Sequence, residues 1–295
     1  MRTITLLSLL TLVQPFFCHA QTYRMSRWNR DLMVNAGAGV ASYYGEMVDQ
    51  GDIIRPKLNF TVGAEHYLSP FFSARLSFSW FQLEARDLDA DPSDTRRTRN
   101  LSFKSNNVEL SAIGVVNLFH QGLKFYDRVR INLHAFAGIG VLHFNPKAQY
   151  NGQWYALQPL ETEGRHYSLV QPVIPFGLGA RIKVSHFMNI LVEGGYRATF
   201  TDHLDDVSSR NYPDPASLKS DLSRALSDRR RELGGDSQPM VGVRGNPTRD
   251  DGYLIVSVSL QYYLPMELDK NARKKAYYRD VKYHRQGNPK QVPGR

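Results

Sequence analysis

The stretch Leu254-Ile-Val-Ser-Val-Ser-Leu-Gln-Tyr262 decides the fold. Every second side chain from Leu254 to Tyr262 is large and apolar, whereas Ser257, Ser259 and Gln261 lie at the alternate positions. Successive side chains of a β-strand point to opposite faces, so a period of two predicts a strand with one wholly apolar face. Such a strand is typical either of a soluble sheet sandwich or of a barrel in a lipid membrane.

Seven further segments repeat this alternation, which predicts eight strands in all. Leu58, Phe60 and Val62 alternate with Asn59 and Thr61 in one of the clearest cases. The pattern is as clear over 72–80 and 190–200, and weaker over 32–44, 106–118, 129–144 and 170–183. We expect consecutive strands to pair as an antiparallel up-and-down meander.

The connections between these strands alternate in length, which favours the barrel. Short ones fall at 69–70, 120–127 and 185–188, and long ones fall at 45–56, 85–103, 145–167 and 203–251. Membrane barrels of the bacterial outer membrane have short turns on the periplasmic side and long loops outside.

Aromatic residues near the strand ends predict two girdles at the membrane interfaces. One group comprises Tyr67, Phe71, Phe119, Phe187 and Tyr263. The other comprises Tyr44, Trp80, Phe144, Phe200 and Tyr253.

Charged residues on the polar faces of the strands are the third feature. They are Glu65, Arg75, Glu109, His134, Arg181, Glu193 and Arg197. A sandwich offers no place for this set, whereas a barrel of eight strands fills its interior with side chains. We expect opposite charges to pair there, because an unpaired charge in a narrow lumen is costly. The sequence therefore predicts an all-β, eight-stranded antiparallel transmembrane barrel of the OmpA-like type, plugged rather than conducting.

The ends of the chain predict two segments outside the barrel, which itself spans 21–265. Residues 1–20 are typical of a signal peptide: Arg2 precedes an apolar stretch over 4–17, and Cys18-His19-Ala20 forms the cleavage site. A lipoprotein anchor at Cys18 is disfavoured, because Pro15-Phe16-Phe17 is no lipobox. An even number of strands then places both termini in the periplasm, in the outer membrane of a Gram-negative cell.

The basic character of the chain is concentrated in the tail, residues 266–295. The whole chain has 37 Lys and Arg against 28 Asp and Glu, and nine basic and three acidic residues of these lie in the tail. In the periplasm an acidic protein or anionic lipid is a better target than nucleic acid. A solvated terminus without a partner is the alternative. The candidate contact residues are Arg273, Lys274, Lys275, Tyr277, Tyr278, Arg279, Lys282, Tyr283 and Arg285.

The last long loop predicts a helix from Ser217 to Leu233. It follows Asp214-Pro215, a helix-start signal, and Leu218, Leu222 and Leu226 fall on one face. This helix either covers the mouth of the barrel or contacts a partner.

No established catalytic, nucleotide-binding or metal-binding motif occurs in the sequence. Asp202-His203 with Asp205-Asp206 offers a conceivable metal or acid–base cluster, but such a run is more typical of a turn with Asx capping. We expect no enzyme activity, cofactor, metal or small-molecule substrate.

A resemblance covers the last third of the chain. Val192-Glu-Gly-Gly-Tyr-Arg197 is followed by Thr201-Asp-His-Leu-Asp-Asp-Val-Ser208, and Arg244-Gly245-Asn246-Pro247 precedes the final strand. These runs, with Asp202, Asp205 and Asp206 at their centre, resemble the PorG-type outer-membrane barrels. In that family Tyr commonly stands where His203 is found here, and the basic tail beyond Leu264 is longer here than the resemblance leads us to expect.

PorG-type barrels are accessory components of the type IX secretion system of the Bacteroidetes. The resemblance implies a non-enzymatic barrel that anchors a periplasmic ring of PorK-like and PorN-like proteins and supports export of proteins with C-terminal sorting domains. Its other partners would be outer-membrane lipids. Two alternatives stay open: a stand-alone OmpA-like structural or adhesive barrel, and a lipid-modifying enzyme that uses Asp202, His203 or Asp205.

Overall fold

A computed structural model describes residues 31–48, 55–120, 128–234, 244–248 and 250–264. The predicted signal peptide, 1–20, and the predicted tail, 266–295, both lie outside the described residues. All nine candidate contact residues of the tail lie outside them as well.

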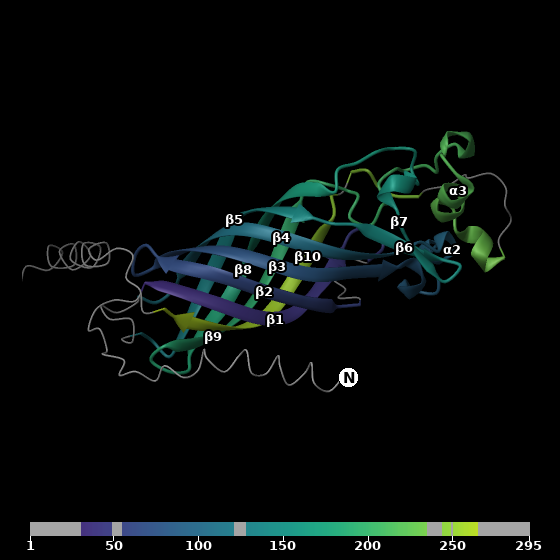
Figure 1. Cartoon of the computed structure of the whole chain (residues 1–295). Coiled ribbons are helices and arrows are strands. Elements are labelled where there is room, and N and C mark those ends of the chain that lie inside the picture. Colours follow the sequence, from purple (N-terminus) through teal and green to yellow (C-terminus); the bar gives the residue numbers. More distant parts are fainter. Residues whose placement is uncertain (1–30, 49–54, 121–127, 235–243, 249, 265–295) are drawn as a thin grey trace, which may run out of the picture.

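Eight antiparallel strands close into a barrel (Figure 1). Each strand pairs with its neighbour in sequence order, and β1 pairs with β10 to complete the ring. The predicted fold, a closed eight-stranded up-and-down barrel, is confirmed. The barrel strands are β1 (Leu32–Tyr44), β2 (Lys57–Tyr67), β3 (Phe72–Arg86), β4 (Ser102–Asn117), β5 (Ile131–His143), β8 (Val170–Lys183), β9 (Met188–Thr199) and β10 (Gly252–Tyr263).

The apolar face of every barrel strand points outward, as the alternation predicts. Leu178 at the middle of β8 is 70% exposed, and large exposed apolar side chains lie on all eight strands. Soluble monomers rarely expose a continuous apolar surface of this size. An apolar belt around a closed barrel is the exterior that a lipid bilayer requires.

The remaining elements gather at one end of the barrel, on the right in Figure 1. The loop between β5 and β8 contains the hairpin β6 (Pro146–Tyr150) and β7 (Gln153–Ala156), with η3 (Gln158–Leu160) after it. The loop between β3 and β4 contains η2 (Asp87–Asp89) and α2 (Arg96–Arg99). We call these segments, with the loop between β9 and β10, the loop cap. None of the helices in the described ranges has the length and hydrophobicity of a membrane-spanning helix.

The predicted helix 217–233 is wrong in its continuity. The segment forms three short pieces, η4 (Pro215–Ser217), α3 (Asp221–Ser227) and η5 (Arg230–Leu233). Ser220 caps α3 through a hydrogen bond from the backbone N–H of Ser223. The backbone is extended at Asp228, and its carboxylate accepts hydrogen bonds from the backbone and the side chain of Arg230. This local side-chain bonding competes with helical pairing and ends α3.

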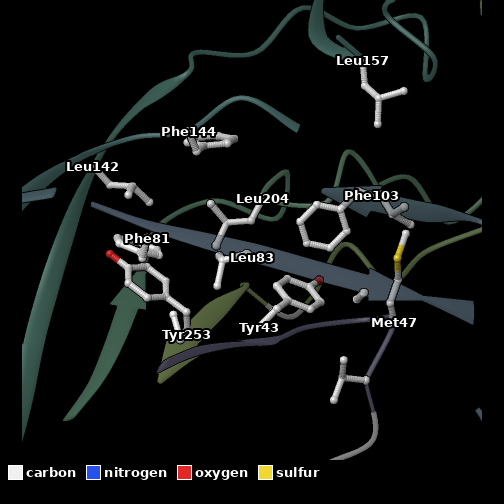
Figure 2. Close-up of a cluster of buried hydrophobic side chains, with 14 of the residues drawn as sticks. Tyr43, Met47, Phe81, Leu83, Phe103, Leu142, Phe144, Leu157, Leu204 and Tyr253 are labelled. Carbon is white, nitrogen blue, oxygen red and sulfur yellow. The ribbon is translucent and has the colours of Figure 1, made fainter. Parts of the chain in front are cut away.

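Apolar clusters fill both ends of the lumen. At the loop end Tyr43, Leu83, Phe103 and Leu204 belong to a large buried cluster between the strand ends and the loop cap (Figure 2). At the other end a smaller cluster contains Met33, Tyr67 and Tyr263, with Phe187 against it.

This arrangement corrects part of the predicted girdles. Phe71, Phe119 and Phe200 are exposed at the rims, as expected of residues at a membrane interface. Tyr67, Tyr263, Phe144 and Tyr253 are buried instead, so these four aromatic rings plug the barrel.

The outward face yields a prediction about depth in the membrane. Arg in place of Leu178 would put a charge near the middle of the apolar belt and should lower the free energy of unfolding in lipid by about 2–4 kcal/mol. Val170 shares the same face at the loop end of β8 and is 50% exposed, so Val170→Arg should cost roughly 0–1 kcal/mol. Urea unfolding of both variants in lipid vesicles measures the difference. Equal costs would contradict the placement of the belt.

Candidate functional site

The seven charged residues predicted for the lumen all point inward, and the structure joins them across it. Glu65 on β2 lies at the centre of the first group. Its carboxylate forms an ion pair of 2.6 Å with Arg181 on β8. It also accepts hydrogen bonds from Ser73 at 2.5 Å and from Gln261 at 3.0 Å. Because β2 and β8 are not neighbours in the ring, the Glu65–Arg181 pair ties opposite walls of the barrel together.

Arg75 on β3 joins this group to a second one. Both terminal nitrogens of its guanidinium donate to Glu193 on β9 at 2.7 Å, and its Nε lies 3.3 Å from Glu65. His134 Nε2 lies 2.7 Å from the same Glu193 carboxylate. A bidentate pair of this kind fixes geometry as well as charge.

The third group lies nearer the loop end. Arg197 Nε lies 3.5 Å from Glu109, and the Tyr253 hydroxyl donates to Glu109 at 2.7 Å. The lumen thus holds three carboxylates, Glu65, Glu109 and Glu193, against three guanidiniums, Arg75, Arg181 and Arg197.

The space left in this part of the lumen is small. A cavity of about 20 Å³ is bounded by Arg75, Phe136, Glu193 and Arg197. A water molecule needs roughly 10–15 Å³, so this cavity holds about one. The lumen is therefore a packed, charge-balanced core and not a channel.

The residues that carry the family resemblance form a second cluster, in the loop cap. Arg244 is buried and pairs with Glu163, and it donates to the backbone carbonyl of Asp206 at 3.0 Å. The backbone N–H of Arg244 donates to Arg210 at 2.8 Å, and that of Gly245 donates to Ser209 at 3.0 Å. The two motif runs therefore meet in space, whereas Asn246 and Pro247 beside them are exposed.

Asp206 connects these contacts of Arg244 to the loop between β5 and β8. Its carboxylate accepts a hydrogen bond from the Tyr167 hydroxyl at 2.7 Å and another from Thr162. Burial raises the pKa of Asp206 to about 6, although Arg244 opposes the shift. His203 stacks on the ring of Tyr167 with the ring centroids 4.6 Å apart. Burial lowers the pKa of His203, so its imidazole is neutral at pH 7.

Four other carboxyl groups gather where β9, β10 and β1 end. The Tyr43 hydroxyl lies 2.7 Å from Asp205 and 2.6 Å from Asp251. Carboxylate oxygens of Glu46, Asp202 and Asp251 all lie within 4.8 Å of one another. Burial and the Asp202 carboxylate raise the pKa of Glu46 to about 8, and burial with Asp205 raises that of Asp202 to about 7. Burial also raises the pKa of Asp205 and of Asp251 well above the ordinary range.

Sequence reasoning singled out Asp202 and Asp205 but missed Glu46 and Asp251. Each of the missed residues lies within two residues of a strand end, after β1 and before β10. Since β9, β10 and β1 are adjacent in the ring, their loop ends must meet. The pairing of β1 with β10 was therefore the signal that could have pointed to Glu46 and Asp251. It becomes available only once the barrel is known to close.

A closed ring of strands with an apolar exterior and a filled lumen defines a small, plugged membrane β-barrel. The chain belongs to the family described as a domain of unknown function (DUF6089), whose model matches residues 9–220. Among curated proteins, none matches the chain.

Solved structures of other small barrels are similar to this chain at low identity. Neisserial surface protein A is 9% identical, with a TM-score of 0.39, over 79% of this chain and 97% of its own. A major outer membrane protein from Thermus thermophilus is 13% identical, with a TM-score of 0.38, over 79% and 98%. Ail, the attachment invasion locus protein of Yersinia pestis, is 9% identical, with a TM-score of 0.36, over 79% and 99%. The strand pairing itself defines the fold here.

The lumen network predicts the effect of removing one charge. Glu65→Gln keeps the shape of the side chain but leaves Arg181 and Arg75 in the lumen without a full counter-charge. We expect the free energy of unfolding to fall by about 3–5 kcal/mol, as when one partner of a buried pair is removed. Chemical unfolding in detergent micelles measures the change.

Glu161→Gln is the matched control, because Glu161 forms its ion pair with Lys219 on the surface of the loop cap. This variant should unfold at the same denaturant concentration as the parent protein. If Glu65→Gln also unfolded there, the network would not stabilise the barrel.

Proposed function

We propose that this protein is an outer-membrane barrel that acts through its surfaces and conducts nothing through its lumen. The apolar belt on all eight strands supports a place in the outer membrane. The packed lumen supports a role other than a pore, since eight strands leave room only for side chains. The short turns then face the periplasm and the loop cap faces outward.

Within that class, we propose that the barrel anchors the periplasmic ring of a type IX secretion system. The PorG-type resemblance over 192–208 and 244–247 carries this proposal. A filled lumen agrees with it, because an exported protein cannot pass through this barrel and must take another route. A tether needs only a stable membrane anchor and a binding surface on the periplasmic side.

The binding surface lies, in this proposal, at the end with the short turns. The loop cap is at the opposite end and is occupied by its own contacts, Arg244 with Glu163 among them. The basic tail adds a charged segment after β10, and long-range attraction to an acidic ring protein would speed and strengthen the contact.

Deletion of the gene in its own host tests the proposal. The amounts of secreted and surface proteins would be compared with the parent strain by mass spectrometry. We expect a loss of many proteins with C-terminal sorting domains, while the other outer-membrane proteins keep their levels. An unchanged set of secreted proteins would reject the export role and favour a stand-alone structural or adhesive barrel.

Removal of the tail tests where the ring binds. A variant lacking 266–295 should lose most of the ring proteins when the barrel is purified from detergent extracts, although the barrel itself still folds. In a second variant only the basic residues of the tail become Gln, so that its Tyr residues are kept. Loss in both variants indicates an electrostatic contact, and retention in both would assign the contact to the short turns instead.

A further inference from the structure

Three carboxylates from different parts of the chain converge at the loop end of the barrel. Glu46 follows β1, Asp202 follows β9 and Asp251 precedes β10, and one oxygen of each lies within 4.8 Å of the other two. Asp251 is held in place, since it accepts hydrogen bonds from the Tyr43 hydroxyl at 2.6 Å and from the backbone N–H of Leu204 at 2.9 Å. One Glu46 oxygen accepts from the backbone N–H of Asn246 at 3.3 Å.

The Asp202 carboxylate indicates that this cluster has a binding partner besides the described side chains. The residue is only 8% exposed, neither of its carboxylate oxygens has a hydrogen-bond donor among the described residues, and its polar neighbours Glu46 and Asp251 are carboxyl groups as well. The second oxygen of Glu46 is buried without a partner as well. Buried polar groups in native proteins are almost always satisfied, so oxygens left bare in this way indicate a missing partner.

The nearby guanidinium groups do not supply that partner. Arg96 pairs with Asp94 at 2.6 Å, Arg99 pairs with Asp87 at 2.5 Å, and Arg244 pairs with Glu163. Each guanidinium therefore has a carboxylate of its own. Within the part of the chain that the structure describes, no ion pair neutralises Glu46, Asp202 or Asp251.

We propose that Glu46, Asp202 and Asp251 bind a divalent cation of the calcium type. The three side chains offer only oxygen ligands, which hard cations such as Ca²⁺ prefer over the nitrogen and sulfur ligands typical of zinc. Glu46 is half-buried, so the cluster is reachable from solvent on the Glu46 side. The site is independent of the secretion role proposed above.

A cation at this point ties together three neighbouring strand ends and the loops that leave them. It would bridge the loop after β1 to both ends of the loop between β9 and β10, which carries the resemblance motif. The loop cap should therefore be more stable with the cation than without it, because a ligand that binds only the folded state stabilises that state.

Metal binding by the full-length mature protein in detergent, stripped with a chelator, tests the proposal. Tb³⁺ is the first probe, because the Tyr43 hydroxyl bonded to Asp251 is near enough to sensitise its luminescence. We expect sensitised emission that Ca²⁺ displaces, with a Kd on the order of 10⁻⁴–10⁻³ M, as in other extracellular calcium sites. At ten times the Kd, Ca²⁺ should raise Tm by roughly 3–5 °C.

Asp202→Asn is the decisive variant, since it keeps the size of the side chain and removes one negative charge from the cluster. We expect it to weaken Ca²⁺ binding by about tenfold or more, because affinity follows the number of charged ligands. Glu46→Gln is the second variant and should do the same. Asp221→Asn is the control, because the Asp221 side chain is 99% exposed at the start of α3, and it should bind like the parent.

Two outcomes would overturn the proposal. One is an unaltered Ca²⁺ affinity in both cluster variants, which would place the ion elsewhere. The other is a parent protein with no sensitised emission and no Tm change up to roughly 10 mM Ca²⁺, ten times the upper end of that Kd range. In that case the carboxyl groups take up protons instead of a cation. Asp202→Asn should then raise Tm without any metal, because an amide removes the cost of protonating a buried carboxylate.

Discussion

Closure of the strand ring is the constraint on which the rest of this structure depends. Lipid offers no hydrogen bonds, so each backbone N–H and C=O in the membrane must pair within the protein, and a sheet can achieve this only without edges. Here β1 pairs with β10 from Met33 opposite Tyr263 to Tyr44 opposite Gly252. The same register sets the width of the lumen and brings the ends of three strands together. Both the charge network and the acidic cluster follow from it.

A lumen this narrow must be neutral, and the two clusters reach neutrality by different means. In the lumen Glu65, Glu109 and Glu193 face Arg75, Arg181 and Arg197, so charge is balanced by side chains alone. In the loop cap Arg244 pairs with Glu163, and no ion pair among the described residues neutralises Glu46, Asp202 or Asp251. These groups must take up protons or a cation. Burial and the neighbouring Asp202 carboxylate raise the pKa of Glu46 to about 8, which reflects the same excess of negative charge.

The alternation of side chains predicted the fold and the inward position of all seven lumen charges, because both depend only on whether a residue is odd or even along its strand. The predicted aromatic girdles were partly wrong, because the residues were chosen by their nearness to a strand end. Whether a side chain faces lipid or the lumen depends instead on its odd or even position along the strand. Tyr67 and Tyr263 have the parity of Glu65 and Gln261 on their strands, so both turn inward. The prediction of one continuous helix over 217–233 is wrong at Asp228, where local hydrogen bonds outweigh a favourable run of helix formers. The acidic cluster depends on contacts between residues 49 to 205 positions apart, and local patterns do not show such contacts.

The position of the resemblance motif bears on how the two ends of the barrel divide their work. Arg244, Asp206 and Glu163 are buried and bonded to one another, so they hold the loop cap in shape and are not free to bind a partner. A chain can therefore share this motif because it shares the cap, whatever lies at the opposite end. Under the proposed function, a contact with a secretion ring would therefore depend on the short turns and the basic tail, and changes in the cap would act on stability. The barrel between the two ends is packed and cross-linked by Arg75 and Arg181, which separates the loop cap from the short turns.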